Sequence, residues 1–191
     1  MAVDSSFDTT EKKQLVKEKQ LENKSEKGKQ SLENAIVQIM TKHKMTLSAA
    51  ESCTGGMLSA KVINVPGASA VYEAGFVTYA NKAKHKLIGV KNKTLQKYGA
   101  VSKETAEEMV KGTLKASGAD YAVAITGIAG PGGGTEEKPV GLVYIGCGRK
   151  HHIVVKDYRF SGDRTQIRES CVENALLQLW ELLTKDINKK K

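Results

Sequence analysis

The residues best suited to chemistry lie in one short segment, residues 51–56, which reads Glu-Ser-Cys-Thr-Gly-Gly. A run typical of a short strand, residues 46–50, precedes it, and a run typical of a helix, residues 57–63, follows it. Sheets of α/β proteins bind ligands where their strands end, so the hydroxyl of Ser52 faces the expected crevice. The helix that follows begins with the backbone N–H groups of Cys53, Thr54, Gly55 and Gly56. N–H groups at a helix N-terminus can bind an oxyanion or a phosphate. The segment predicts a nucleophilic serine, and the alternative is a capped helix start that binds no ligand.

A serine needs a base to accept its proton, and the four histidines fall at predicted surface positions. No Gly-x-Ser-x-Gly elbow surrounds Ser52 either, which leaves a lysine or a tyrosine as the base. Tyr79 and Lys84 lie at the next transition from strand to helix, so both could face the same sheet edge. A lysine shielded from water can lose its proton near neutral pH and act as a base. The alternative is an ordinary surface lysine.

Cys53 is the competing nucleophile, because a thiolate at a helix N-terminus has a lowered pKa. Neighbouring residues at a strand end point in opposite directions, so we expect only one of Ser52 and Cys53 to face the crevice. Cys147 and Cys171 are expected in the core. The histidines, cysteines and carboxylates show no metal-ligand spacing, so neither a metal nor a cofactor is expected.

A second candidate region is the glycine-rich stretch of residues 126–134, Thr-Gly-Ile-Ala-Gly-Pro-Gly-Gly-Gly. It lacks the Gly-Lys-Ser/Thr ending of a Walker A loop and departs from Gly-x-Gly-x-x-Gly at Thr135. Its backbone could form a nest for a phosphate, and a flexible connection is the alternative. Asp163 and Arg164 precede the last predicted helix, where the first could cap the helix and the second could pair with the phosphate. The binding residues expected here are Thr126, Gly127, Gly130, Gly132, Gly133 and Arg164.

Strands alternate with helices along the chain from residue 31 onward. Apolar residues spaced three or four apart predict helices near residues 32–40, 57–63, 81–88, 103–117 and 167–183. Alternating or continuous apolar runs predict strands at residues 46–50, 72–79 and 121–125 and a hairpin of residues 140–147 and 153–160. This order predicts a three-layer α/β/α sandwich around a mixed sheet.

Length and composition restrict the possible classes of protein. The 191 residues suffice for one domain, predicted at residues 31–185, with a basic tail at residues 186–191. Residues 1–30 alternate lysine with glutamate and hold few large apolar residues, so a disordered or weakly helical extension is expected. The net charge is +9, yet aromatic residues make up only 5% and interrupt no basic run. Nucleic-acid binding is therefore not expected.

Compartment and membrane expectations follow from the same composition. No apolar run approaches the length of about 18 residues that a membrane span requires. The acidic residues near the N-terminus fit neither a secretory signal nor a transit peptide, and three widely spaced cysteines form no disulfide framework. We expect a cytoplasmic protein without a membrane partner.

Several motifs, in their order and spacing, resemble the C-terminal domain of the CinA family of competence/damage-inducible proteins. Stand-alone members of that family are nicotinamide mononucleotide deamidases of the PncC type. The resemblance extends from about Leu32 to Leu183. The motifs that carry it are residues 50–56, 75–84, 99–102, 126–131, 136–141 and 160–164.

The resemblance implies an α/β/α fold with a mixed, mostly parallel five-stranded sheet in which one strand is antiparallel. It implies an amidohydrolase, a nicotinamide-nucleotide amidase of pyridine nucleotide recycling, which converts nicotinamide mononucleotide to nicotinate mononucleotide and ammonia. By position, Ser52 resembles the family's nucleophile, Tyr79 its assisting tyrosine and Lys84 its catalytic lysine. The expected partners are this substrate and a second copy of the chain in a dimer.

Two other classes of function stay open at this point. One is a domain that binds a nucleotide without turning it over. The other is an accessory protein of competence or DNA damage that acts near nucleic acid.

Overall fold

The structure is a computed structural model, and it describes residues 31–189. The predicted extension, residues 1–30, lies outside the described residues, as do the last two residues of the predicted basic tail. Leu32 begins a compact unit with its own core.

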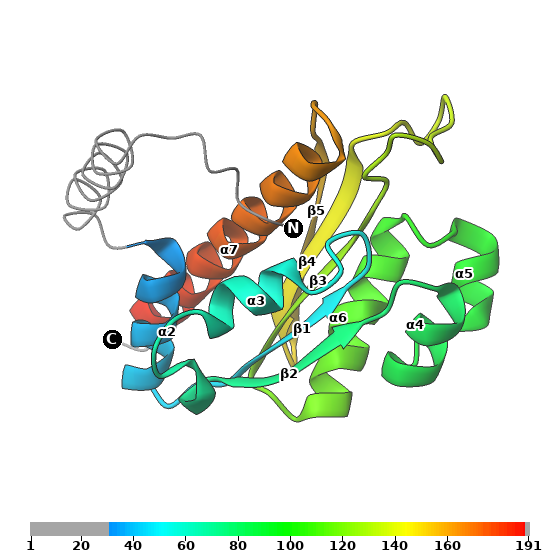
Figure 1. Cartoon of the computed structure of the whole chain (residues 1–191). Coiled ribbons are helices and arrows are strands. Elements are labelled where there is room, and N and C mark those ends of the chain that lie inside the picture. Colours follow the sequence, from blue (N-terminus) through cyan, green and yellow to red (C-terminus); the bar gives the residue numbers. More distant parts are fainter. Residues whose placement is uncertain (1–30, 190–191) are drawn as a thin grey trace, which may run out of the picture. The chain divides into compact units, whose positions relative to one another are not determined.

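Five strands form one sheet in the order β2-β1-β3-β4-β5 (Figure 1). The strands are β1 (Leu47–Glu51), β2 (Tyr72–Val77), β3 (Tyr121–Gly127), β4 (Leu142–Arg149) and β5 (His152–Arg159). Strand β1 pairs in parallel with β2 and β3, whereas β4 is antiparallel to both of its neighbours. The predicted sheet, mostly parallel with one antiparallel strand, is confirmed.

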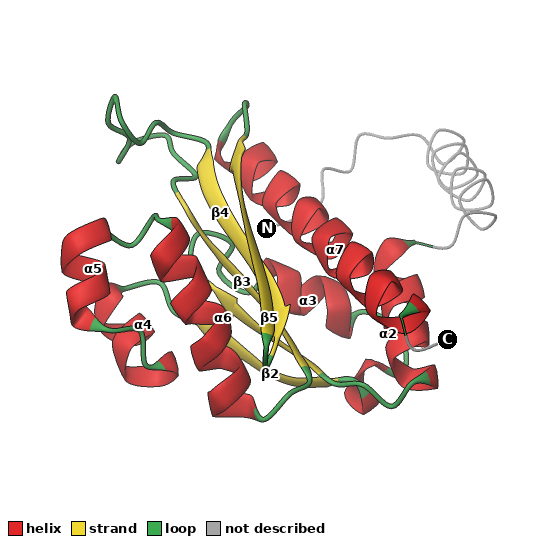
Figure 2. Ribbon diagram, turned by 180° about the vertical axis from the view of Figure 1, so that it is seen from behind, coloured by secondary structure: helices red, strands yellow, loops and turns green. Residues whose placement is uncertain are grey.

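Helices cover both faces of this sheet (Figure 2). One face carries α2 (Leu32–Lys42), α3 (Met57–Ile63) and α7 (Arg164–Asn188), and a short 3-10 turn, η1 (Ala68–Ala70), follows α3. The other face carries α4 (Asn81–Ile88), α5 (Asn92–Tyr98) and α6 (Lys103–Ser117). The three-layer α/β/α sandwich is therefore confirmed.

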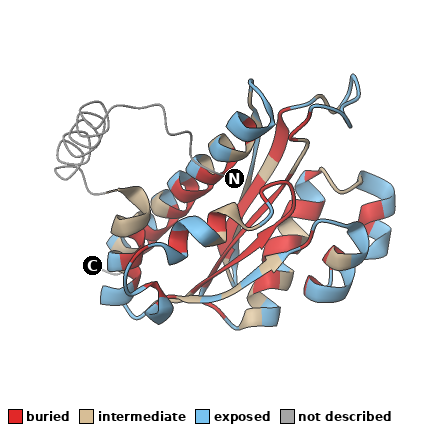
Figure 3. Ribbon diagram, viewed as in Figure 1, coloured by how far each residue is buried: buried red, intermediate tan, exposed pale blue. Residues whose placement is uncertain are grey.

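Strand β3 divides the core into two clusters because successive side chains point to opposite faces. Its large residues, Tyr121, Val123 and Ile125, join the cluster that α7 covers. Its small residues, Ala122 and Ala124, join the cluster beneath α6. The central strands are buried on both faces, as Figure 3 shows, so their register is strongly determined by apolar packing.

Helix α4 lies close to α6 because Gly112 has no side chain. A Cβ at Gly112 would stand only 1.7 Å from the carbonyl oxygen of Ile88, the last residue of α4. This close approach draws α4 inward, and Lys84, in the middle of that helix, becomes fully buried.

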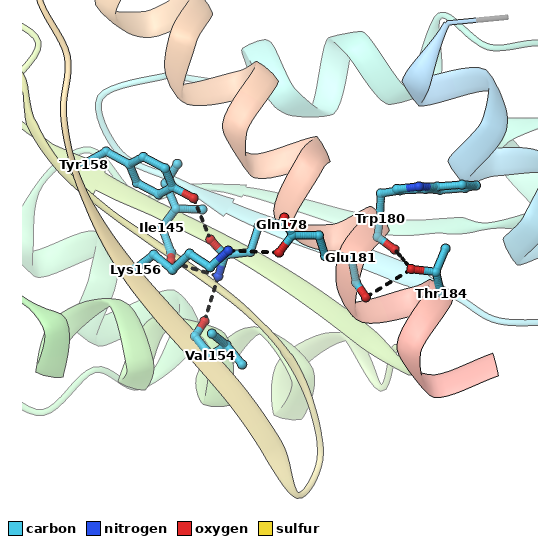
Figure 4. A network of polar contacts seen from close by, with 8 residues as sticks. All are labelled: Ile145, Val154, Lys156, Tyr158, Gln178, Trp180, Glu181 and Thr184. Carbon is cyan, nitrogen blue, oxygen red and sulfur yellow. Dashed lines mark hydrogen bonds and ion pairs between the residues drawn. The ribbon is translucent and has the colours of Figure 1, made fainter. Parts of the chain in front are cut away.

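Helix α7 is tied to the antiparallel part of the sheet by the buried side chain of Gln178 (Figure 4). Its Nε2 donates to the carbonyl oxygens of Ile145 and Val154, at 3.3 and 3.0 Å, and its Oε1 accepts from the Tyr158 hydroxyl. These bonds satisfy a polar group that would otherwise be costly to bury. An exposed ion pair between Lys156 and Glu181 lies beside them.

Two sequence predictions differ from the structure. Helix α5 was not predicted, because only Thr94 and Leu95 of its residues are buried and its first residue has no side-chain cap. The basic tail was predicted from residue 186, but α7 continues to Asn188 and buries Asp186. Hydrogen bonds from Arg149 and Tyr121 hold the Asp186 carboxylate inside the domain.

Within residues 31–189, no helix combines the length and the apolar character that crossing a membrane requires.

Candidate active site

The chain segments after β1, β2 and β3 meet at one edge of the sheet, because these three strands run in parallel. The backbone N–H of Ser52 donates to the carbonyl oxygen of Ile125 at 3.0 Å, and that of Thr78 donates to Glu51 at 2.7 Å. Ser52 and Thr78 therefore extend the strand pairing by one residue. The side chain of Ser52 is almost buried at this edge.

Lys84 reaches this edge from α4 and contacts Ser52 directly. Its Nζ lies 2.9 Å from Ser52 Oγ, 2.8 Å from the carbonyl oxygen of Thr78 and 3.4 Å from that of Tyr79. The residue is 0% exposed, and none of the ion pairs among residues 31–189 includes it. A buried amine with neutral partners is unusual for a lysine, because burial without a counter-charge disfavours its ammonium form.

Burial lowers the pKa of Lys84 to about 8, against an opposing effect of the neighbouring Cys53. The three acceptors suit the charged amine, which has three N–H donors. The neutral amine can still donate to the two carbonyl oxygens while its lone pair accepts from the Ser52 hydroxyl. Both protonation states are thus satisfied in the same geometry, as a group that takes up and releases a proton requires.

Glu51 organises the turn that follows the nucleophile position. Its fully buried carboxylate accepts from the backbone N–H groups of Gly56, Leu58 and Ser59 and from the Ser59 hydroxyl. These donors are the start of α3, so the positive end of that helix is already neutralised by a carboxylate. The predicted oxyanion donor at Gly56 is wrong for this reason, since its N–H is occupied.

Arg168 holds the same turn from α7. Its guanidinium donates to the carbonyl oxygens of Cys53 and Thr54 at 3.0 and 2.9 Å. No local sequence signal could have indicated this contact, because Arg168 lies more than a hundred residues away along the chain.

A cavity of about 250 Å³ opens beside Ser52 and Lys84. It gathers most of the predicted site residues, namely Ser52, Cys53, Tyr79, Lys84, Thr126, Gly127, Gly130, Gly132, Gly133 and Arg164. Thr54, Gly55 and Gly56 do not line it, because the chain turns away from the cavity into α3. Lining residues that the sequence analysis missed are Ala100, Val101, Ile128 and Ala129, which are small or apolar and carry no chemical signal.

Arg164 and Tyr79 lie at the cavity with their charged or polar ends largely uncommitted. Arg164 Nη1 donates to the carbonyl oxygen of Gly130 at 2.7 Å, and its residue is exposed. Asp163 caps α7 by accepting from the backbone N–H groups of Thr165 and Gln166. Arg164 takes no part in this cap and can pair with an anion. The side chain of Tyr79 is 65% exposed, and its hydroxyl has no hydrogen bond within residues 31–189.

Cys53 is also among the residues that line the cavity, but its side chain packs into the core cluster that α7 covers and bonds to Cys171. Ser52 Oγ instead contacts Lys84 of α4, on the other face of the sheet, so the two side chains point in opposite directions, as the sequence led us to expect. A hydrogen bond with Cys171 lowers the pKa of Cys53, against its burial, and the charges of Lys84 and Arg168 act in the same direction as that bond. Cys147 and Cys171 are buried, as expected for core residues.

No group of three or more histidine, cysteine or acidic side chains in residues 31–189 is arranged to hold a metal ion.

The fold and the site define an α/β/α protein with a buried serine–lysine pair at the carboxyl ends of parallel strands. The family model of the CinA C-terminal domain matches residues 29–183. The chain belongs to the CinA C-terminal domain family.

Relatives and solved structures agree with this assignment. A CinA-like protein of Kosmotoga olearia is 50% identical over 149 residues, which are 78% of this chain and 36% of that protein. The chain thus spans about a third of the length of the curated relatives it matches. The competence/damage inducible protein CihA of Agrobacterium tumefaciens is 44% identical with a TM-score of 0.78, covering 79% of this chain and 93% of that one. A CinA superfamily protein of Escherichia coli is 36% identical with a TM-score of 0.77, covering 79% and 88%.

Proposed function

We propose that this protein is a nicotinamide-nucleotide amidase that hydrolyses the carboxamide of nicotinamide mononucleotide to nicotinate mononucleotide and ammonia. The observation that carries the proposal is the distance of 2.9 Å between Lys84 Nζ and Ser52 Oγ, with the amine fully buried. A serine hydroxyl becomes a useful nucleophile only when an adjacent base takes its proton. A lysine whose pKa lies near 8 holds an uncharged fraction at neutral pH and can be that base.

In the proposed reaction, neutral Lys84 takes the proton of Ser52 as Oγ attacks the carboxamide carbon. The N–H of Cys53, next to the nucleophile, stabilises the oxyanion, an interaction worth about 3–4 kcal/mol in comparable sites. The Lys84 ammonium then protonates the departing nitrogen, which leaves as ammonia. Water attacks the acyl-enzyme with Lys84 again as base and releases the carboxylate and the free serine. A share for Tyr79 in these proton transfers stays a prediction.

The 5′-phosphate of the substrate requires a separate anchor. Arg164 lines the cavity together with Gly130, Gly132 and Gly133, and only one guanidinium nitrogen of Arg164 is bonded to Gly130. The remaining donors of Arg164 suit bidentate pairing with a phosphate. The cavity volume of about 250 Å³ lies just below the range of roughly 300–1,000 Å³ that is typical of small-molecule sites, which suits a ligand of mononucleotide size.

Ammonia release from nicotinamide mononucleotide, nicotinamide riboside and nicotinamide tests the proposal. We expect activity on the phosphorylated compound alone, because the anchor recognises its phosphate. Equal activity on all three compounds would remove the phosphate anchor. Saturable binding of nicotinamide mononucleotide without ammonia release would contradict the amidase and favour a nucleotide-binding domain.

The two adjacent candidate nucleophiles provide a matched pair of variants. Ser52→Ala is expected to lower kcat by about 10³-fold or more, because nucleophile and base act as a unit. Cys53→Ala removes the thiol of the adjacent residue, which bonds to Cys171 and not to Lys84, and is expected to keep kcat within about threefold. Near-normal turnover by Ser52→Ala, or loss of turnover in Cys53→Ala alone, would indicate that the Cys53 thiol is the nucleophile.

A cytoplasmic location and a homodimer stay predictions from the sequence. Size-exclusion chromatography with light scattering measures the second directly, and a monomeric mass would contradict it.

A further inference from the structure

The glycine-rich loop and the segment before α6 form two walls of the cavity. Ala129, Gly130, Gly132 and Gly133 of the loop line the cavity, and Ala100 and Val101 of the other segment line it as well. The two walls are about 30 residues apart in sequence, and neither is a helix or a strand. Side-chain contacts between the two segments therefore help to fix their separation.

Lys138 makes such a contact. Its Nζ donates to the carbonyl oxygen of Tyr98 at 2.7 Å and to that of Val101 at 2.8 Å. We refer to these two hydrogen bonds as the Lys138 clasp. Although Glu136 and Glu137 are its neighbours in sequence, Lys138 takes part in none of the ion pairs among residues 31–189. Its charge is committed to backbone carbonyl oxygens.

The backbone on both sides of the Lys138 clasp is arranged to receive it. On the loop side, Lys138 and Thr135 close a tight turn, in which each residue's backbone N–H reaches the other residue. On the opposite side, all four carbonyl oxygens of residues 98–101 accept hydrogen bonds from side chains. Their donors are Lys138, Ser102, Thr105 and Thr126.

Gly99 leaves the space that the Lys138 clasp occupies. Its φ of +78° favours glycine, and a Cβ there would stand 3.3 Å from Lys138 Nζ. A side chain at position 99 would strain the backbone and push Lys138 Nζ away by a few tenths of an ångström, so glycine suits this position.

We infer that Lys138 is a positioning residue that sets the width of the substrate cavity by holding the glycine-rich loop against residues 98–101. This inference rests on the proposed amidase function, because it assigns the residue to that same cavity. Lys138 does not line the cavity and does not contact Ser52 or Lys84. Loss of the Lys138 clasp should therefore weaken substrate binding and leave the chemical step intact.

Steady-state kinetics of Lys138→Met test the inference, since methionine keeps the length of the side chain and removes its donors. We expect KM for nicotinamide mononucleotide to rise about tenfold, with kcat within about threefold of the wild type. Lys138→Arg keeps donors for both carbonyl oxygens and should restore most of the affinity. Gly99→Ala disturbs the Lys138 clasp from its other side and should show the same division between KM and kcat.

Lys156→Met is the matched control, because it removes a lysine that is bonded to Glu181 on α7, outside the cavity. It should change neither KM nor kcat. A KM of Lys138→Met within twofold of the wild type, or a fall in kcat at unchanged KM, would overturn the inference. Melting temperatures of all variants separate an altered cavity from a partly unfolded protein, because unfolding lowers the active fraction and leaves KM unchanged.

Failure of the amidase proposal has a different signature. Isothermal titration of nicotinate mononucleotide into the wild type and Lys138→Met measures the Lys138 clasp without any turnover. A Kd about tenfold weaker in the variant, with no ammonia release by the wild type, would support the positioning role of Lys138 and reject the amidase function. Equal Kd values for both proteins would reject the positioning role of Lys138.

Discussion

The Ser52–Lys84 pair and the cluster around Asp186 lie at opposite ends of the same sheet. Lys84 is buried against a hydroxyl and two carbonyl oxygens. Asp186 is buried against a guanidinium and a phenol, with 2.7 Å from Arg149 Nε to Asp186 Oδ2 and 3.0 Å from the Tyr121 hydroxyl to the same oxygen. Within the described residues, Lys84 has no ion-pair partner, whereas Asp186 is paired with Arg149.

This difference decides the protonation of each group. Burial lowers the pKa of Lys84 to about 8, because no neighbouring carboxylate compensates its charge. Burial alone would raise the pKa of Asp186, but the hydrogen bonds from Arg149 and Tyr121 outweigh it, and its pKa lies below the usual value. A paired charge stays charged and stabilises the fold, whereas an unpaired amine is ready to exchange a proton.

The largest expected effect comes from removing the unpaired amine. Lys84→Met should lower kcat by about 10³-fold or more, and the double variant with Ser52→Ala should be no worse than either single variant. Ammonia release measures both. Strict additivity of the two losses would show that the residues do not act as a pair.

The same substitution should not destabilise the protein at pH 7. The folded-state pKa of about 8 lies below the usual 10.5, so the folded state carries the cost of an ammonium that burial disfavours. That cost is present below pH 8 and is relieved as the pH rises toward 10.5, because there the unfolded chain binds more protons. Urea unfolding of Lys84→Met should give a stability equal to or above that of the wild type at pH 7.

The pH dependence of the wild type follows from the same pKa. The neutral amine is the base, so kcat/KM should fall about tenfold per pH unit below pH 8 and level off above it. Initial rates between pH 6 and 10 measure this profile. A midpoint near 6.5 would instead indicate a histidine, and a flat profile would remove Lys84 as the base.

The smallest effect on activity is expected from the paired cluster. Asp186→Ala leaves the buried Tyr121 hydroxyl without its acceptor, which should lower the free energy of unfolding by about 1–3 kcal/mol. Activity below the unfolding transition should stay within about twofold, because the cluster lies at the far end of the sheet. A large loss of kcat in the folded variant would contradict the view that the Asp186 cluster stabilises the fold and takes no part in the reaction.

Much of the local structure was predictable from the sequence. The helices at residues 57–63 and 81–88 have the predicted bounds, because they lie between a glycine turn or a strand end and a change in apolar pattern. Ser52 and Lys84 each follow a strand end in sequence, so both were candidates for the same sheet edge. Helix α5 was missed because its lysine-rich sequence buries too few residues to show a period.

The sequence alone determined which side chains were available at the ends of the strands, because strand and helix patterns depend on neighbours a few positions away. Only the tertiary structure decided what those side chains can do. The proton affinity of Lys84 depends on its burial, and the close approach of its helix α4 to Gly112 of α6 is a contact between segments far apart in sequence. The N–H of Gly56 is occupied because a carboxylate five residues earlier folds back onto it. Charge, burial and hydrogen-bond partners are set by segments that meet only in space, and no pattern of neighbouring residues records them.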